Sequence, residues 1–310
     1  MKSTASFFLI SFIIFPIYLH GQDDLFDMFE KEETNFAYAS FKSTRIVLGQ
    51  SIENPKNGSL NMEIQHQFGN MNGGGYELWG LDQATMRFGF DYGITNWLAV
   101  GVGRSSLNKT YDGHVKTKIL RQSSGARKMP IALSYFGGVY YNSLKWEDPD
   151  RENYEVSRLS YAHQLLIARK FTKNITFQIT PSFIHRNLVE TAEDENDVFS
   201  VGAGGRFKLT KWISINAEYF YLLPGNTADK FEDSFSVGVD IETGGHVFQV
   251  YLTNSQGMQE PYFIANTSDS WSNGDLHLAF NLIRTFSLKK PDSFKKDKKE
   301  KKNKKEDKKE

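Results

Sequence analysis

The stretch Asp275–Leu288, DLHLAFNLIRTFSL, decides the fold. Its even positions carry Leu, Phe and one Arg, and its odd positions carry His277, Ala279, Asn281, Ile283, Thr285 and Ser287. Successive side chains of a β-strand point to opposite faces, so this period of two predicts a strand with one apolar and one mostly polar face. The alternation also runs past the about 5–6 residues of a usual globular strand and reaches the about 9–11 of a membrane strand.

The same alternation recurs along the chain and predicts twelve strands. We place them at residues 59–68, 82–94, 97–107, 113–122, 130–143, 156–170, 175–188, 198–209, 212–223, 234–243, 246–255 and 275–288. A soluble β-sandwich also alternates, with its apolar face turned inward. Alternation alone therefore does not distinguish a membrane barrel from a soluble sandwich.

Connection lengths and aromatic positions favour the membrane architecture. Short connections at 95–96, 172–174, 210–211 and 243–245 alternate with longer ones, as in outer-membrane barrels; the pair 108–112 and 123–129 breaks the rule. Trp97, Trp212 and Phe171 stand directly beside short turns, where an interfacial girdle of rings is expected. We predict an all-β protein: a transmembrane antiparallel up-and-down β-barrel of about 12 strands, with a disordered Lys-rich C-terminal tail.

The two ends of the chain differ from this body. Residues 1–21 have the layout of a cleaved signal peptide, with an uncleaved anchor as the alternative, and residues 22–58 are expected in the periplasm. The apolar piece Thr44–Gln50 would give an odd strand count, so we expect it at the rim or in the lumen of the 59–288 barrel. We expect residues 289–310 to form a disordered tail, either solvated or bound to an anionic periplasmic partner. The protein is thus expected in the outer membrane of a Gram-negative bacterium, in contact with its lipid.

Composition excludes several classes of function. The chain of 310 residues has no Cys, which removes disulfide frameworks, Cys-ligated metal sites and thiol nucleophiles. The formal net charge is zero, and the basic surplus lies in the tail, so we expect no nucleic-acid partner.

Charged residues on the polar faces are candidates for the lumen, because a charge facing lipid at mid-depth costs about 2–4 kcal/mol. They serve either as ion pairs that fill a narrow lumen or as the walls of a polar conduit. These candidates are Glu63, Arg87, Asp91, Lys116, Lys118, Arg158, Arg186, Arg206, Lys208, Glu218, Asp240 and Glu242.

Six charged or histidine side chains instead occupy strand positions that are expected to face lipid. Arg104, Arg121, Arg169, His185 and Arg284 lie near strand ends, where a long side chain can reach the interface. His163 lies nearer the middle of its strand, so either a neutral imidazole is tolerated there or a bulge shifts the register.

A search for catalytic motifs is mostly negative. No Ser or Thr lies two positions after any of the seven histidines, the spacing that would pair both side chains on one strand face. Phosphate-binding and paired-His zinc motifs are absent from the sequence, and we expect the acidic loop 194–197 to be solvated. We therefore predict no catalytic residues, no cofactor, no metal and no enzymatic activity, although a Ser–His pair across neighbouring strands stays open.

Three segments, Thr44–Glu53 (TRIVLGQSIE), Ile94–Ser105 (ITNWLAVGVGRS) and Arg127–Leu133 (RKMPIAL), resemble an uncharacterised family of outer-membrane β-barrel proteins from Bacteroidetes. The resemblance covers about residues 28–288. It implies a barrel fold and an outer-membrane location and brings no functional residues. The leading functional hypothesis is a channel or passive transporter for small polar solutes. The alternatives are an outer-membrane lipid-modifying enzyme and a non-conducting docking barrel.

Overall fold

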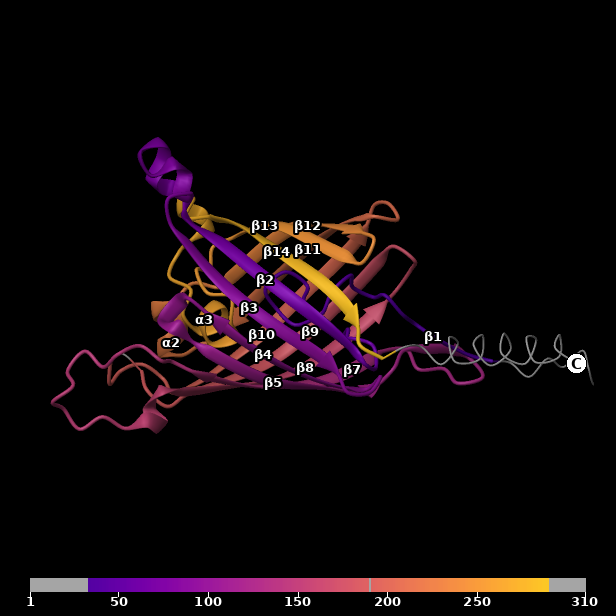
Figure 1. Cartoon of the computed structure of the whole chain (residues 1–310), viewed down its shortest axis with the longest axis horizontal. Helices are drawn as coiled ribbons and strands as arrows, with labels where there is room; N and C mark the ends of the chain where they lie inside the picture. The colour runs from indigo at the N-terminus through magenta and orange to yellow at the C-terminus, as the bar shows by residue number, and fades with distance from the viewer. Residues whose placement is uncertain (1–32, 190, 290–310) are drawn as a thin grey trace, which may run out of the picture.

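Twelve antiparallel strands close into a single barrel (Figure 1). The computed structural model describes residues 33–189 and 191–289; the expected signal peptide and most of the Lys-rich tail lie outside these ranges. Each strand pairs with its neighbours along the chain, and the ring closes where the last strand pairs with the first. The strands are β2 (Ser59–Asn70), β3 (Ala84–Gly93), β4 (Leu98–Ser105), β5 (Tyr111–Leu120), β7 (Ala132–Tyr141), β8 (Leu159–Lys170), β9 (Ile175–Arg186), β10 (Asp197–Lys208), β11 (Ile213–Leu222), β12 (Ser234–Thr243), β13 (His246–Thr253) and β14 (His277–Ser287). The predicted fold class is confirmed.

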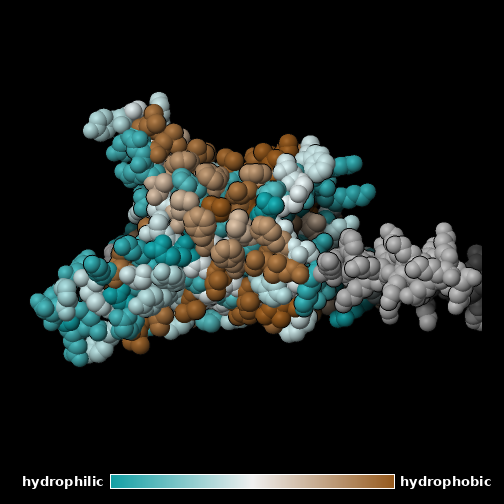
Figure 2. Space-filling model, in the orientation of Figure 1, coloured by the Kyte–Doolittle hydropathy of each residue, from teal (hydrophilic) through white to brown (hydrophobic). Residues whose placement is uncertain are grey.

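Side chains alternate between a buried lumen face and an outward face along the barrel strands. In β14, His277, Ala279 and Asn281 are fully buried, whereas Leu278 and Phe280 point outward. Figure 2 shows the result as an apolar band across the barrel wall, with hydrophilic loops at the left end of the view. This is the inverse of a soluble sandwich, whose apolar face turns inward.

One end of the barrel carries the longer connections and the other the tighter turns. Five connections at the first of these ends contain short helical turns: η1 (Met71–Gly80), η2 (Leu107–Lys109), η3 (Glu155–Arg158), α2 (Asn226–Lys230), and α3 (Glu260–Ala265) with η4 (Trp271–Asn273). None of the helices in the described ranges has the length and apolarity needed to cross a membrane. The two ends are called the long-loop end and the short-turn end below.

The one long connection at the short-turn end has a structural reason. Between β5 and β7 the chain forms β6 (Ser123–Gly125), which pairs with β1 (Thr34–Phe36) outside the barrel. Strand β6 thus offers an edge on which the N-terminal segment docks before it enters the barrel. This pairing explains the length of the connection at 123–129, whereas the β4–β5 connection at the long-loop end is a single short turn, η2.

Aromatic side chains mark the interface as predicted. Trp97, Phe171 and Trp212 are each more than half exposed beside a short turn. Three lipid-facing arginines lie over aromatic rings, which accommodates their charge at the edge of the apolar band. These pairs are Arg104 on Tyr111, Arg169 on Phe171 and Arg284 on Phe286. The lipid-facing assignment of Arg121 is wrong, because the register of β5 shifts before its end and Arg121 lines a cavity with Tyr38 and Glu53.

His163 lies on the lipid face without a change of register. The pairings of β8 with β7 and with β9 run without a bulge, so the bulge considered as an explanation is wrong. The imidazole Nδ1 instead lies 2.7 Å from the hydroxyl of Tyr135, and its ring stacks on Phe183. A cross-strand hydrogen bond therefore satisfies the polar group in the apolar band.

The assignment of Ile179 to the lipid-facing side of the wall can be tested by substitution. Ile179→Arg places a charge in the middle of β9 on the lipid side, where its cost is about 2–4 kcal/mol. We expect the free energy of unfolding, measured by urea titration of vesicle-inserted protein, to fall by about that amount. Ile179→Leu is the control, and an equally stable Ile179→Arg protein would contradict the assigned face.

Candidate functional site

Two inserts, one from each end, occupy the barrel lumen. The hairpin segment (residues 40–53) enters from the short-turn end, and the α3 loop (residues 254–276) folds in from the long-loop end. Leu48, Phe263 and Ile264 are fully buried and belong to one hydrophobic cluster with wall residues such as Phe220. The candidate site is therefore the interface between the polar wall and these inserts.

The hairpin segment is held by its own tight turn. The Ile46 amide donates to the Gly49 carbonyl at 2.8 Å, and the Ser51 amide donates to the Thr44 carbonyl at 2.9 Å. An isolated bridge joins Arg45 to Gln50. Thr44–Gln50, predicted at the rim or in the lumen, thus lies in the lumen.

A wall carboxylate binds the tip of the hairpin segment. The carboxylate of Glu218 accepts hydrogen bonds from three successive amides, those of Val47 (3.2 Å), Leu48 (2.6 Å) and Gly49 (3.0 Å). Successive N–H groups that converge in this way form an anion-binding concavity. A side chain at Gly49 would meet the ring of Phe220 at 2.7 Å, which explains the need for glycine at the tip.

Basic wall residues bind main-chain carbonyl groups of the same part of the chain. The Lys116 ammonium donates to the carbonyls of Thr44 and Ser51 at 3.1 and 3.2 Å. Closer to the short-turn end, the Arg206 guanidinium donates to the carbonyls of Ala39 and Ser40, both at 2.9 Å. The side chains of the wall therefore hold the hairpin segment through its main-chain amides and carbonyls.

The two inserts meet at a buried charge cluster. Arg45 Nε lies 3.1 Å from Glu63 Oε2, and its Nη1 lies 3.6 Å from Glu260 Oε1 in α3. The Gln50 amide donates to the same Glu260 oxygen at 2.9 Å. On the wall, Arg87 bridges Glu63 at 3.1 Å and Asp112 at 2.5 Å. Removing one partner from such a buried set costs about 3–5 kcal/mol, so the cluster fixes where each insert stops.

The α3 loop has further anchors on the wall. The Tyr262 hydroxyl lies 2.7 Å from Thr110 Oγ1, and Arg186 Nη1 donates to Asn266 Oδ1 at 2.6 Å. The ring of Phe263 packs edge-to-face on Phe220, beside the tip of the hairpin segment. One aromatic contact thus couples the two inserts.

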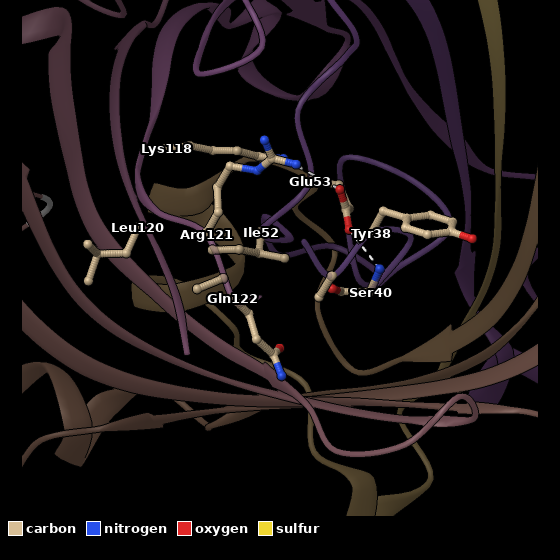
Figure 3. Close-up of a pocket in the computed structure, with 10 residues that line it drawn as sticks. Tyr38, Ser40, Ile52, Glu53, Lys118, Leu120, Arg121 and Gln122 are labelled. Carbon is tan, nitrogen blue, oxygen red and sulfur yellow. Dashed lines mark hydrogen bonds and ion pairs between the residues drawn. The ribbon is translucent and has the colours of Figure 1, made fainter. Parts of the chain in front are cut away.

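A small cavity of about 70 Å³ marks the entry of the hairpin segment at the short-turn end (Figure 3). Glu53 accepts the Ser40 amide at 2.7 Å and lies 3.6 Å from the Lys118 ammonium. Glu53 therefore joins the two arms of the hairpin segment and ties them to β5. Tyr38 and Arg121 line the same cavity.

Most of the predicted charged residues line the lumen. Eight of them are buried inside the barrel: Glu63, Arg87, Asp91, Lys116, Arg186, Arg206, Glu218 and Asp240. Lys118, Lys208 and Glu242 are half-buried toward the short-turn end.

Arg158 is the exception, and its assignment to the lumen is wrong. It lies in η3, before β8 begins, so the alternation of β8 does not fix its direction. Its guanidinium lies 3.8 Å from the ring centre of Trp146 and donates to the Asn142 carbonyl in the long loop.

Sequence reasoning missed six charged residues of the site: Lys42, Arg45, Glu53, Asp112, Lys170 and Glu260. Asp112 shares the parity of Lys116, and Lys170 has the lumen parity of β8, so longer or more complete strand assignments would have found both. Lys42, Arg45, Glu53 and Glu260 lie outside the strands, where alternation gives no signal. Within the described ranges, His, Asp and Glu side chains form no group of three that would hold a metal ion.

The hydrogen bonds of Glu218 to the hairpin tip predict slow amide hydrogen exchange at residues 47–49. Glu218→Gln removes the charge, and hydrogen bonds to a charged acceptor are each worth about 1.5–3 kcal/mol. We expect amide hydrogen exchange at residues 47–49, followed by mass spectrometry, to accelerate at least tenfold, roughly the effect of 1.4 kcal/mol. Glu242→Gln, which affects only the Lys42 contact near the short-turn end, is the matched control. Unchanged exchange at 47–49 in Glu218→Gln would show that this carboxylate does not hold the tip.

Comparisons with known proteins agree with this architecture. Residues 41–286 match the model of the membrane bound beta barrel domain DUF5777. No curated protein matches the chain. The chain is similar in structure to the NanC porin (8% identity, 74% of this chain and 100% of that chain covered, TM-score 0.47) and to the KdgM porin (9%, 74% and 99%, TM-score 0.45). It is also similar to the outer membrane protein Omp33 of Acinetobacter baumannii (8%, 76% and 100%, TM-score 0.40). These three similarities are too distant to bear on activity, whereas the family match spans most of the chain: the protein belongs to the DUF5777 family of membrane-bound β-barrel domains.

Proposed function

We propose that the protein is an outer-membrane channel for small polar solutes whose resting state is closed by the hairpin segment and the α3 loop. One observation carries the proposal: the hairpin segment is attached to a polar wall by side-chain contacts alone. The barrel is complete without it.

The hydrogen-bond pattern of the hairpin segment supports this. Within residues 40–53, the backbone-to-backbone hydrogen bonds described, Ile46 to Gly49 and Ser51 to Thr44, are internal to the segment. The strand ladder closes through β14 and β2 without any contribution from the hairpin segment. Moving this segment therefore breaks no ladder hydrogen bond.

The wall behind the inserts suits water or polar solutes. Amide and hydroxyl groups of β2, β8, β9 and β10 face the lumen, and several of their atoms have no hydrogen-bond partner among the described protein atoms. Gln65 Nε2, Gln164 Oε1, Gln178 Oε1 and Ser200 Oγ are of this kind. Buried polar atoms without a protein partner call for water or a polar ligand, which a lumen permeable to polar solutes supplies.

The lipid-modifying enzyme is less well supported. The lipid-facing histidines with described hydrogen bonds pair with Tyr135 and Asp197, not with a serine or threonine hydroxyl. A hydrolase of that type needs a hydroxyl nucleophile in hydrogen-bond reach of its base. A non-conducting docking barrel is separated from a channel by conductance alone.

The location belongs to the same proposal. Closed barrels of an even number of strands with short turns at one end are the outer-membrane pattern, and the short-turn end would face the periplasm. We place the protein in the outer membrane of a Gram-negative bacterium, exported by the cleaved signal peptide 1–21; the Bacteroidetes source stays a prediction. Because β14 ends beside Gly58 at the short-turn end, the Lys-rich residues 289–310 would start in the periplasm, in reach of an anionic partner. A tail-deleted protein with an unchanged periplasmic pull-down profile would refute that contact.

A cross-link between the hairpin segment and the wall tests the channel. A Cβ at Gly204 would lie 3.5 Å from Cγ2 of Ile46, the atom bonded directly to the Ile46 Cβ. The two Cβ atoms therefore lie within about one bond length of the about 3.5–4.5 Å that separates disulfide Cβ atoms. Because the chain has no native Cys, the double substitution Ile46→Cys and Gly204→Cys forms one defined disulfide. In planar bilayers we expect openings of the oxidised protein to vanish and those of the reduced protein to match the unmodified chain.

Ile46→Cys alone, cycled through the same redox conditions, is the control. Equal conductance of the oxidised and reduced double variant would show that the hairpin segment does not gate. Absence of any conductance, also when residues 41–52 are replaced by a Gly-Ser linker in a correctly folded barrel, would rule out the channel.

A further inference from the structure

We propose that the solutes of this channel are zwitterions with a peptide backbone: amino acids and short peptides. This inference rests on the proposed channel function and names its substrate class. It comes from the distribution of charge around the lumen.

The lumen-facing charges are segregated into two arcs of the barrel. In the closed strand order, β5, β7, β8, β9 and β10 are consecutive, and so are β11 to β14 followed by β2 to β4. The first group, the basic arc, carries Lys116, Lys118, Lys170, Arg186, Arg206 and Lys208 on its lumen face. The second group, the acidic arc, carries Glu218, Asp240, Glu242, Glu63 and Asp91.

The two exceptions neutralise each other. Arg87 on β3 and Asp112 on β5 are the lumen charges of opposite sign to their arcs, and they form a salt bridge at 2.5 Å across β4. Strands β4, β7, β13 and β14, described over their full lengths, have no Asp, Glu, Lys or Arg facing the lumen. The remaining field therefore runs across the lumen, from the basic arc to the acidic arc.

Such a field discriminates between classes of solute. Opposite charges held apart by a low-dielectric wall interact much more strongly than in bulk water. A solute with separated positive and negative ends aligns with the field and is stabilised by both arcs. An ion of one sign is attracted to one arc and repelled by the other, and a neutral solute gains little.

The hairpin segment shows which groups the charged residues of the two arcs accept, because its atoms in contact with those charged residues are sorted by sign. To the carboxylates of the acidic arc it presents donors and cations: the amides of residues 47–49 to Glu218, Arg45 to Glu63 and Lys42 to Glu242. The hairpin segment thus binds to the wall as a ligand that belongs to the same chain.

To the basic arc, the hairpin segment and the two residues before it present hydrogen-bond acceptors. Carbonyls of Thr44 and Ser51 face Lys116, those of Ala39 and Ser40 face Arg206, and that of Tyr38 faces Lys170. The Glu53 carboxylate faces Lys118. A free peptide offers the same groups, with an ammonium at one end and a carboxylate at the other.

Neutral amides on the wall extend this match to the middle of a peptide. On the acidic arc, Gln249 and Asn281 donate to the carbonyls of Ile46 and Val47 at 3.0 and 3.1 Å. On the basic arc, Gln178 donates to the Gln50 carbonyl at 2.7 Å. The wall therefore has partners for main-chain carbonyls between the two charged ends, which favours peptides over zwitterions that lack amides.

Permeation of four size-matched solutes tests the inference. The protein with residues 41–52 replaced by a Gly-Ser linker is reconstituted in liposomes, and swelling rates are compared for glycylglycine (zwitterion), glycylglycinamide (cation), N-acetylglycine (anion) and N-acetylglycinamide (neutral). We expect glycylglycine to enter several-fold faster than the neutral solute, with both ions slower than glycylglycine. Because the linker variant lacks the hairpin segment, selectivity is measured apart from gating by that segment.

Wall variants assign the preference to the arcs. Lys116→Gln with Arg206→Gln is expected to abolish the glycylglycine preference and to favour the cation. Glu218→Gln with Asp240→Asn is expected to abolish it and to favour the anion. Ser200→Ala, a neutral change on the lumen face of β10, is the matched control and should keep the preference.

The outcomes separate the two proposals. Equal entry of glycylglycine and N-acetylglycinamide, or a preference untouched by both pairs of wall variants, overturns the zwitterion inference and leaves the channel standing. Entry of none of the four solutes overturns both. If the linker variant fails to fold, the reduced Ile46→Cys/Gly204→Cys protein, which keeps the hairpin segment, is used for the same comparison with the same criteria.

Discussion

The structure depends on one constraint: in hydrocarbon, every backbone N–H and C=O must find its partner within the protein. The pairing of β14 with β2 meets this constraint by closing the sheet and removing its edges. Closure in turn separates two environments for side chains, because alternate residues of each strand face either lipid or the lumen. The aromatic and arginine pairs near the strand ends, and the Tyr135 hydroxyl on His163, are local solutions to the same requirement for side chains.

Closure also determines how the lumen is filled. A segment inside a closed barrel finds no free strand edge, so it has to bind through side chains of the wall. The hairpin segment does so with its amides on Glu218 and its carbonyls on Lys116 and Arg206. Buried ion pairs such as Arg45 with Glu63 and Glu260 roughly break even against their desolvation, so they specify a position more than they add stability. A hairpin held in this way is well placed and still able to leave, which is what a gate requires.

The two inserts contact each other inside the lumen. Glu260 in α3 contacts both Arg45 and Gln50, and Phe263 packs on the ring that supports the hairpin tip. A displacement from either side therefore disturbs the other insert. A lumen with separated basic and acidic arcs would then receive in their place a solute that carries both charges.

The sequence by itself determined the strands, their faces and the side of the wall on which eleven of twelve charged candidates lie, because a period of two is a local property that each strand carries. It also indicated that Thr44–Gln50 is not a barrel strand, since closure requires an even count. Only the tertiary structure decided what fills the lumen and how its charges are sorted. Gln50 and Glu260 are 210 positions apart and meet only because the hairpin segment and the α3 loop enter from opposite ends. Arg158 was misassigned because alternation holds only inside a strand, and its residue lies one position before β8. The two arcs likewise appear only when the ring closes and sets β5 to β10 against the strands from β11 round to β3.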